Sequence, residues 1–263
     1  MFYQQKVGSF MEHKVTGSIV TYNNMNTIGK TLETLFEFTK DIDFKLYVVD
    51  NVSADGTPDF IEKNYPQVEV IRMKENVGFG SGHNVVIEKI NSLYHAVINP
   101  DIFMIENAVK EMADFMDENS DVGLLSPRIS FPDGRDQILG KRNPHLKYLV
   151  ASRLRGDEPG RLLREYAMLD ADLSKPVEIE NATGCFMMFR TDVLKKIGGF
   201  DRRYFMYFED ADITRTVNSV SRALYYPYAT VNHVWSRESK RNTKLMMIHF
   251  KSMLKYFLKW KTV

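Results

Sequence analysis

Residues 45–57, KLYVVDNVSADGT, decide the fold, because an apolar run stops at an acidic residue and passes directly into a turn-forming stretch. A short run of this kind, bounded by Asn, Asp and Gly, is typical of a buried strand. Further strand-like runs cover residues 17–21, 68–73 and 95–99. Between the strands, helical patterns cover residues about 27–40, about 58–64 and a segment that ends near residue 93. This alternation predicts an α/β fold with a mainly parallel central sheet flanked by helices and joined by right-handed crossovers.

Length, composition and charge limit the classes of function. With 263 residues, 44% of them hydrophobic, the chain can bury the core of one large domain. Its 35 basic residues are balanced by 34 acidic ones, whereas a nucleic-acid-binding protein normally carries a basic excess. We therefore expect a single domain over residues 1–263, with no nucleic acid among its partners.

Cysteine content and the N-terminal segment indicate a cytoplasmic protein. Cys185 is the single cysteine, so no disulfide can form within the chain, and we expect a small buried side chain there. Residues 1–14 contain Lys6 and Glu12 and no long apolar run, unlike a signal peptide. No stretch reaches the roughly 18 apolar residues needed to cross a bilayer, so any membrane contact would be peripheral.

Polar residues collect just beyond the carboxyl ends of the predicted strands, where ligands bind in open α/β sheets. Strand by strand, they are Tyr22 and Asn23, Asp50 and Asn51, Asn76 through Asn84, and Asn99 with Asp101. Because four successive strands deliver polar side chains to one edge, the sequence predicts a binding site there.

Asp50 and the glycine-rich run bear on what binds at this edge. Asp50 either caps the turn after its strand or accepts the imide N–H of a uracil or thymine, and both interpretations stay open. GFGSGH, residues 78–83, departs from the dinucleotide-binding fingerprint, because His83 stands at the third glycine position and the run follows the third strand instead of the first. We interpret its glycines as allowing close backbone approach to a ligand.

Asp101 is the candidate metal ligand. Pro100 cannot continue a strand ladder, so the strand ends there and holds Asp101 at the sheet edge. A single carboxylate in such a place suits a hard divalent cation whose other ligands are waters and phosphates. The competing interpretation, favoured for this residue taken alone, is the N-cap of a helix that starts near Glu106.

The second half of the chain changes character. Residues 130–176 are rich in Arg, Asp, Gly and Pro and predict an irregular insertion with one helix, at about 148–155 or 161–168. A compact region follows at residues 179–233.

Within this compact region, three acids follow the aromatic run YFMYF: Glu209, Asp210 and Asp212. Burial beside aromatic rings would raise a carboxylate pKa and suit a general base, although acid runs more often lie in solvent. His233 is either a metal ligand or a core histidine, and in isolation the core interpretation is favoured.

Taken together, the motifs resemble the family 2 glycosyltransferases of the GT-A fold, and within them the bacterial rhamnosyltransferase branch that builds cell-surface polysaccharides. The matching segments are VTYNN (20–24), VVDNVSADGT (48–57), ENVGFGSGHN (75–84), NPD (99–101), GCFMMFR (184–190), GGFDRRYFMYFEDADITR (198–215) and NH (232–233). Each is weak alone, but the ordered set is specific. The KRNPH segment (141–145) is also similar to that branch, whereas VWSRES, after His233, lacks the glycines common in relatives.

The resemblance implies how a nucleotide-sugar donor is held. Thr21, Tyr22 and Asp50 would contact the nucleobase and ribose. The other predicted donor contacts are Asn23, Asn51, Asn76, Gly78, Asn84, Asn99 and Asp101.

The resemblance also implies the catalytic and metal-binding roles. Asp101 would bind the cation, and His233 would approach the cation or the diphosphate. Asp210 would be the catalytic base, with Glu209 as its main rival. The predicted acceptor contacts are Gly184 and Asp212.

These roles describe an inverting, metal-dependent sugar transferase with Mg²⁺ or Mn²⁺ as cofactor. The donor expected from the resemblance is dTDP-rhamnose, with UDP-galactofuranose, UDP-glucose and UDP-N-acetylhexosamine still open, and the acceptor is a saccharide or lipid-linked saccharide. Residues about 15–128 would form the donor-binding half and about 129–236 the acceptor and catalytic half. The alternatives are a nucleotidyltransferase, which would need a basic glycine-rich loop after the first strand, and a non-catalytic partner subunit of the same fold.

The C-terminal segment, residues about 240–261, predicts an amphipathic helix. At 100° per residue its lysines fall on one narrow face, and apolar side chains spread over much of the remainder. The lysines are Lys244, Lys251, Lys255 and Lys259. One interpretation packs this helix on its own domain, or on a second subunit in a homodimer, with the lysines in water. The other rests the lysine face on an anionic membrane.

Overall fold

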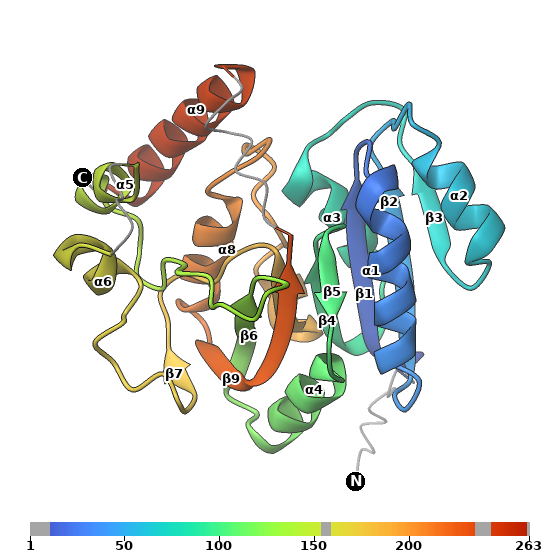
Figure 1. Ribbon diagram of the computed structural model, residues 1–263, viewed down its shortest axis with the longest axis horizontal. Coiled ribbons are helices and arrows are strands. Elements are labelled where there is room, and N and C mark those ends of the chain that lie inside the picture. Colours follow the sequence, from blue (N-terminus) through green and yellow to red (C-terminus); the bar gives the residue numbers. More distant parts are fainter. Residues whose placement is uncertain (1–10, 154–158, 235–242, 262–263) are drawn as a thin grey trace, which may run out of the picture.

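The computed structural model describes residues 11–153, 159–234 and 243–261, which alternate between strands and helices (Figure 1). The strands are β1 (His13–Thr21), β2 (Phe44–Asp50), β3 (Glu69–Arg72), β4 (Ser92–Ile98), β5 (Ile102–Met104), β6 (Val122–Ser130), β7 (Val177–Glu178), β8 (Phe186–Arg190) and β9 (Arg222–His233). The helices are α1 (Met25–Phe38), α2 (Thr57–Asn64), α3 (Phe79–Ile87), α4 (Ala108–Glu118), α5 (Leu146–Arg153), α6 (Arg161–Tyr166), α7 (Thr191–Lys196), α8 (Glu209–Val217) and α9 (Thr243–Trp260).

The predicted parallel half of the sheet is present as β3, β2, β1 and β4, side by side in that order. Asp50, at the end of β2, pairs with Thr21 on one side and with Arg72 on the other, where β1 and β3 also end. Ile98 ends β4 beside Ile19, two residues before the end of β1. The carboxyl ends of these strands therefore meet at one edge, as the sequence predicts.

Helices cover both faces of the sheet (Figure 1). On one face, α1 and α4 contribute Ile28 and Met112 to the largest core cluster. On the other, α3 and α8 contribute Ile87 and Ile213 to a second cluster. The sheet is therefore buried on both sides, which explains why its strands are apolar runs without strict alternation.

The second half of the chain adds antiparallel pairing to the sheet. β8 lies between β4 and β6 and is antiparallel to both, while β6 runs parallel to β9. β5 pairs antiparallel with the end of β9 and sets Ile102 opposite His233. The sheet is thus mostly parallel, and the segment just after β4 meets the end of β9.

Two boundaries differ from the expectation. α3 ends at Ile87 and does not reach residue 93, because Ser92 already begins β4, where its hydroxyl lies 2.8 Å from the Thr16 hydroxyl. The insertion carries two short helices, α5 and α6, instead of one. They are held together by Tyr148 and Tyr166, whose stacked rings have centroids 5.0 Å apart.

The glycines of the run at residues 78–83 pack against protein, which corrects the expectation that they approach a ligand. A Cβ added at Gly80 would lie 2.7 Å from Cβ of Phe200, and one added at Gly82 would lie 2.8 Å from a methyl carbon of Val20. Both distances are too short for real Cβ contacts. The glycines therefore let α3 sit close to the sheet and to the segment after α7.

Asn84 fastens α3 to that segment. Its Nδ2 donates to the Phe200 carbonyl at 2.7 Å, and its Oδ1 accepts from the Phe200 N–H at 2.8 Å. Gly199 has a φ of +70°, and a Cβ there would lie 2.4 Å from Asn84 Oδ1. The buried amide predicted to contact the donor is thus occupied by a contact between the two halves of the chain.

The C-terminal helix is present as α9, and residues 240–242 of its predicted range lie outside the described residues. In the part of the chain that the structure covers, no helix is both long and apolar enough to span a bilayer.

Gly199→Ala is expected to lower the free energy of unfolding more than Gly198→Ala. Both glycines have positive φ, +70° and +80°, so both substitutions carry the cost of a left-handed residue, about 1 kcal/mol. Only at Gly199 does the new methyl group meet an atom, since nothing lies within 4 Å of a Cβ at Gly198. Displacing Asn84 should cost about 1 to 3 kcal/mol more. Urea unfolding measures the difference, and equal effects would show that Asn84 does not fasten the two halves.

Candidate active site

Asp50 ends β2 and is buried at the sheet edge. Its Oδ1 accepts a hydrogen bond from the Thr21 hydroxyl at 2.9 Å, and its Oδ2 accepts one from the Ser53 N–H at 2.9 Å. Asp50 therefore caps the turn, and the buried Thr21 hydroxyl orients it. Because a carboxylate oxygen can accept more than one hydrogen bond, contact between Asp50 and an imide N–H stays a prediction.

The loop after β1 presents Tyr22 and secures Asn23. Tyr22 is 55% exposed, so its ring is open to a ligand at the edge. The N–H of Asn23 donates to Ser53 Oγ at 2.8 Å, and its Oδ1 accepts from the Ala54 N–H at 2.8 Å. Asn23 thus joins the loops after β1 and β2, and its predicted donor contact stays a prediction.

Asn51 and Asn76 shape the loop that leads into α3. Asn51 is buried, and its Nδ2 donates to the Gly78 carbonyl at 3.1 Å, while Asn76 Oδ1 accepts from the Gly78 N–H at 3.0 Å. Gly78 has a φ of +86°, and a Cβ there would lie 2.1 Å from the Phe205 carbonyl oxygen. This loop is therefore pressed against the aromatic segment that precedes the acids.

Asp101 and His233 face each other at the end of β4 and β9. Asp101 Oδ2 lies 3.4 Å from His233 Nε2, and His233 Nδ1 lies 3.1 Å from Gln137 Oε1. Gln137 Nε2 also donates to the His233 carbonyl at 2.8 Å, so one side chain contacts both the imidazole and the backbone of His233. The helix-cap interpretation of Asp101 is wrong, because Asn107 caps α4 by accepting the Lys110 N–H at 3.1 Å.

The residues present fit a divalent cation. Asp101 Oδ1 is buried without a hydrogen-bond partner, which is costly for a carboxylate unless a cation meets it. When His233 donates Nδ1–H to Gln137, its Nε2 lone pair faces Asp101, which is the arrangement of a ligating imidazole. No group of three or more His, Cys, Asp or Glu side chains gathers within the described ranges. Further ligands would therefore come from water and from phosphate oxygens of a substrate.

The surroundings of His233 favour its charged form when no cation is bound. Burial acts to lower its pKa, but the neighbouring Cys185 and Asp101 outweigh burial and raise the pKa of the imidazole to about 10. A cation at Nε2 has to displace that proton, so metal binding should strengthen as pH rises.

Glu209 and Asp210 begin α8 after a sharp turn. Tyr207 and Phe208 have φ values of 71° and 68°, which ordinary residues seldom adopt and which are often found at functional sites. Asp210 Oδ2 accepts the Gly184 N–H at 3.1 Å, and its Oδ1 accepts from the Ala211 N–H at 2.8 Å. These bonds fix the Asp210 carboxylate against the segment before β8.

Burial sets the acidity of both carboxyl groups. It raises the pKa of Asp210 although hydrogen bonds from backbone N–H groups, those of Ala211 and Gly184 foremost, act to lower it. Burial, together with the negative charge of Asp210, raises the pKa of Glu209 to about 8. Glu209 Oε2 is buried without a partner in the structure, as suits a protonated acid next to an ionised one. The pKa of both carboxyl groups is therefore raised, and Asp210 is the member of the pair whose two carboxylate oxygens are held by backbone N–H groups.

One stretch of backbone connects the pair of acids with Asp101. Gly184 holds Asp210, and the carbonyl of the next residue, Cys185, accepts the Asn99 N–H at 2.9 Å. Asn99 is two residues before Asp101, so the predicted base and the predicted metal ligand meet at one corner of the sheet. The structure thus brings together five predicted residues: Asn99, Asp101, Gly184, Asp210 and His233.

Asp212, the other predicted acceptor contact, lies beneath α9. Only 2% of its surface is exposed. Its oxygens accept from Tyr204 Oη at 3.3 Å, Lys259 Nζ at 2.7 Å and Trp260 Nε1 at 2.8 Å. Contact with an acceptor stays a prediction, and the role that these bonds support is that of an anchor for α9.

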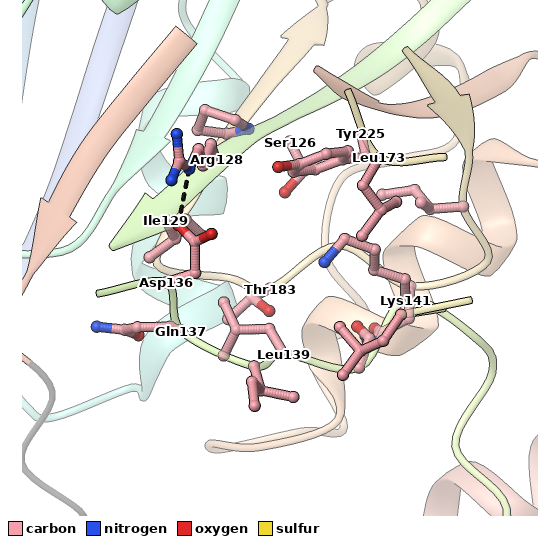
Figure 2. Close-up of a pocket in the computed structure, with 16 residues that line it drawn as sticks. Ser126, Arg128, Ile129, Asp136, Gln137, Leu139, Lys141, Leu173, Thr183 and Tyr225 are labelled. Atoms are coloured by element: carbon pink, nitrogen blue, oxygen red, sulfur yellow. Dashed lines mark hydrogen bonds and ion pairs between the residues drawn. The ribbon is translucent and has the colours of Figure 1, made fainter. Parts of the chain in front are cut away.

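A small cavity of about 80 Å³ lies beside Gln137, between β6, β9 and the loop after β6 (Figure 2). Lys141 lies over the Tyr225 ring, with Nζ 4.7 Å from the centroid, and burial lowers the pKa of its ammonium to about 8. Asn181 also lines this cavity, and its buried Oδ1 has no partner. Thr183, which precedes Gly184 in the chain, adds a hydroxyl group to the lining of this cavity.

Sequence reasoning did not identify Gln137, Lys141 or Thr183 as site residues. No periodicity marks them, because they lie in irregular segments. The one available signal was the KRNPH segment, which begins at Lys141 and is similar to the rhamnosyltransferase branch. The sequence VWSRES, which lacks the glycines common in relatives, lies outside the described residues except for Val234.

Comparison with known proteins places this geometry in context. The family model described as glycosyl transferase family 2 matches residues 18–198. N-acetylglucosaminyl-diphospho-decaprenol L-rhamnosyltransferase of Mycobacterium tuberculosis is 26% identical over 202 residues, which are 71% of this chain and 65% of that protein. The rhamnosyltransferase WbbL of Escherichia coli is 22% identical over 250 residues, 90% of each chain. This chain therefore spans just under two thirds of the length of the mycobacterial relative.

Among solved structures, the mannosyltransferase PcManGT of Pyrobaculum calidifontis, in complex with GDP-Man and Mn²⁺, superposes with a TM-score of 0.63. It is 18% identical, and the match covers 92% of this chain and 64% of that one. This likeness concerns the fold alone and confirms the GT-A type predicted from the sequence.

Glu209→Gln is expected to stabilise the protein at alkaline pH and to change little at acidic pH. The folded-state pKa of Glu209, about 8, lies above its ordinary value of 4.5, so the unfolded chain releases this proton first as pH rises. In the parent, the resulting loss of unfolding free energy is absent below pH 4.5, grows as the pH rises toward 8 and is constant above pH 8. Urea unfolding at pH 4 and pH 8.5 measures it. Glu118→Gln, an exposed acid of α4, is the control. A difference between Glu209→Gln and the parent that does not change with pH would contradict the raised pKa.

Proposed function

The chain belongs to glycosyl transferase family 2, and from that membership we propose that it transfers a sugar, with inversion, from a nucleotide-diphospho-sugar to a saccharide hydroxyl. The observation that carries the proposal is the corner where Gly184 holds Asp210 and Cys185 holds the segment of Asp101. Such a reaction uses a base for the acceptor and positive charge for the leaving group, and Asp210 and Asp101, which would supply them, lie on either side of one backbone connection.

Asp210 acts as the general base. An acceptor hydroxyl is a poor nucleophile at neutral pH, so its proton has to pass to a carboxylate as the oxygen attacks the anomeric carbon. The raised pKa of Asp210 brings its basicity closer to neutral pH, and the protonated Glu209 beside it avoids a second buried charge. The hydroxyl oxygen forms its bond as the diphosphate leaves from the opposite side, which inverts the configuration at that carbon.

Asp101 and His233 would hold a divalent cation, Mg²⁺ or Mn²⁺, with one carboxylate and one imidazole as its protein ligands. When bound, such an ion supplies positive charge that stabilises the leaving group. Gln137 keeps the imidazole oriented toward Asp101. The orphaned Oδ1 of Asp101 supports this assignment.

The donor we propose is dTDP-rhamnose, since two relatives are described as rhamnosyltransferases. Asp50 would accept the imide N–H of thymine, and the exposed Tyr22 ring would lie along the base or ribose. UDP-galactofuranose, UDP-glucose and UDP-N-acetylhexosamine are the other donors to test, since one structural relative was solved in complex with UDP-GlcNAc.

The acceptor we propose is a lipid-linked saccharide at the cytoplasmic face of a membrane. The support is the diphospho-decaprenol named in the mycobacterial relative. The cavity lined by Lys141, Asn181 and Thr183 would hold a hydroxyl-rich or anionic part of it. Peripheral membrane contact through α9 and a homodimer are separate proposals about how the chain assembles.

Purified protein, incubated with Mn²⁺ and a panel of nucleotide sugars, is expected to release nucleoside diphosphate from dTDP-rhamnose above all others. Asp210→Asn should lower the transfer rate about 10²- to 10⁴-fold while leaving donor binding intact, because the base acts on the acceptor. Glu209→Gln is the comparison and should retain most activity. If Glu209→Gln loses activity while Asp210→Asn keeps it, the two roles are reversed. If no donor is bound or consumed, the chain is a non-catalytic member of the family.

Asp101→Asn is expected to abolish the effect of Mn²⁺ on donor affinity, and excess chelator should reproduce that loss in the parent. The physical reason is that Asp101 is one of two side chains that meet at the proposed cation site. Isothermal titration of donor with and without Mn²⁺ measures it. Asp192→Asn, an exposed acid of α7, is the control. Full activity of the parent in excess chelator would rule out the cation.

A further inference from the structure

The buried side of α9 is its polar and aromatic side. Ser252 Oγ donates to the Met206 carbonyl at 2.8 Å, and Lys259 Nζ lies 3.1 Å from Asp201 Oδ2 as well as bonding Asp212. Tyr256 is fully buried in a cluster with Phe208. α9 therefore packs on α8 and on the turn before α8. The two candidate catalytic acids are the first two residues of α8.

These contacts correct the expectation for the lysine face. Lys259 is held by the half-buried Asp201 and the buried Asp212, and Lys255 donates to the Arg203 carbonyl. Two of the four lysines thus fasten α9 to its own domain. The other two, Lys244 and Lys251, lie toward the amino-terminal half of the helix and are exposed.

The side of α9 that faces away from the domain is apolar. Leu258 is 79% exposed, Met247 59% and Phe250 55%, and Met246 and Leu254 are exposed beside them. At 100° per residue these five side chains fall within one sector of about 120°. An apolar stripe left in water over a whole helix marks an interaction surface. We call these five residues the apolar stripe.

α5 lies beside α9 (Figure 1) and extends the apolar stripe sideways. Between the two helices is a groove of about 410 Å³ whose walls include Leu146, Val150, Met246 and Phe250. Leu146 and Val150 are themselves exposed. The groove and the stripe form one continuous apolar surface.

Charge around this surface selects its partner. Lys244 and Lys251 follow the apolar stripe along one edge, and neither α9 nor α5 contains an acidic residue. An apolar stripe bordered by lysines is the pattern of a helix that lies in the interface of an anionic bilayer. A second copy of the chain would bring the same lysines to this face and no acid to pair with them.

We propose that the apolar stripe and the groove beside α5 dock the protein on an anionic membrane, with the stripe among the acyl chains and the lysines at the head groups. The inference extends the proposed function, because it would bring a lipid-linked acceptor to the helix next to Asp210. It rests on the fold of α9 and not on transfer activity, so the two can fail separately.

The test is co-sedimentation of the full chain with vesicles of phosphatidylglycerol and phosphatidylcholine in equal parts, and with vesicles of phosphatidylcholine alone. Binding is expected with the anionic vesicles and at least tenfold weaker with the neutral ones. Met247→Glu, Phe250→Glu and Leu258→Glu together should weaken binding to anionic vesicles at least tenfold. These side chains are exposed, so unchanged circular dichroism and an unchanged unfolding midpoint should show that the variant is folded.

The matched control is Leu93→Glu, Ile105→Glu and Val220→Glu together, which adds the same charge at exposed apolar residues elsewhere. It should bind within about threefold of the parent. The proposal is overturned if the parent does not bind anionic vesicles, or if both triple variants bind equally. It is also overturned if sedimentation velocity without lipid shows a dimer that only the stripe variant loses while vesicle binding is unchanged, since the stripe would then join two copies of the chain.

Discussion

The hydrogen bond from the Asn99 N–H to the Cys185 carbonyl is the contact on which the site depends. It continues the antiparallel pairing of β4 and β8 one residue beyond the end of β4. Through it, the segment that carries Asp101 and the segment that holds Asp210 become two sides of one corner. The adjacent strand β5 then pairs with the end of β9 and adds His233 to the same place. Three distant parts of the chain are thus positioned by strand pairing, which is more rigid than loop contacts.

Two glycines let the two halves of the chain approach each other closely. Gly78 lies against the Phe205 carbonyl, and Gly199 lies against the Asn84 amide, at distances that leave no room for a Cβ. These contacts fasten the donor-side loop to the turn that presents Glu209 and Asp210. Tyr22, by contrast, is exposed at the same edge. The site therefore combines fixed acids with an exposed aromatic side chain.

The strands and helices of the first half could be predicted because each apolar run ends in a clear turn signal, such as Asp50-Asn51. Gln137 could not, since it contacts a residue 96 positions away and no local pattern marks it. The faces of α9 show a different limit of prediction from sequence. Periodicity separates its lysines from its apolar side chains, but which side packs depends on buried acids such as Asp212 that only the fold brings near. Similarly, the sequence alone could not show that Asn107, and not Asp101, caps α4.

The position of β8 also bears on how the chain acquires its fold during synthesis. β4 is paired on one side by β1, but its other neighbour is β8, which is complete only when residue 190 has been made. Until then the donor half leaves an apolar strand edge uncovered, and such edges invite pairing with other chains. A separately expressed fragment that ends near residue 128 would keep this edge permanently. The two halves differ in chemistry, but with respect to folding and aggregation they form one indivisible unit.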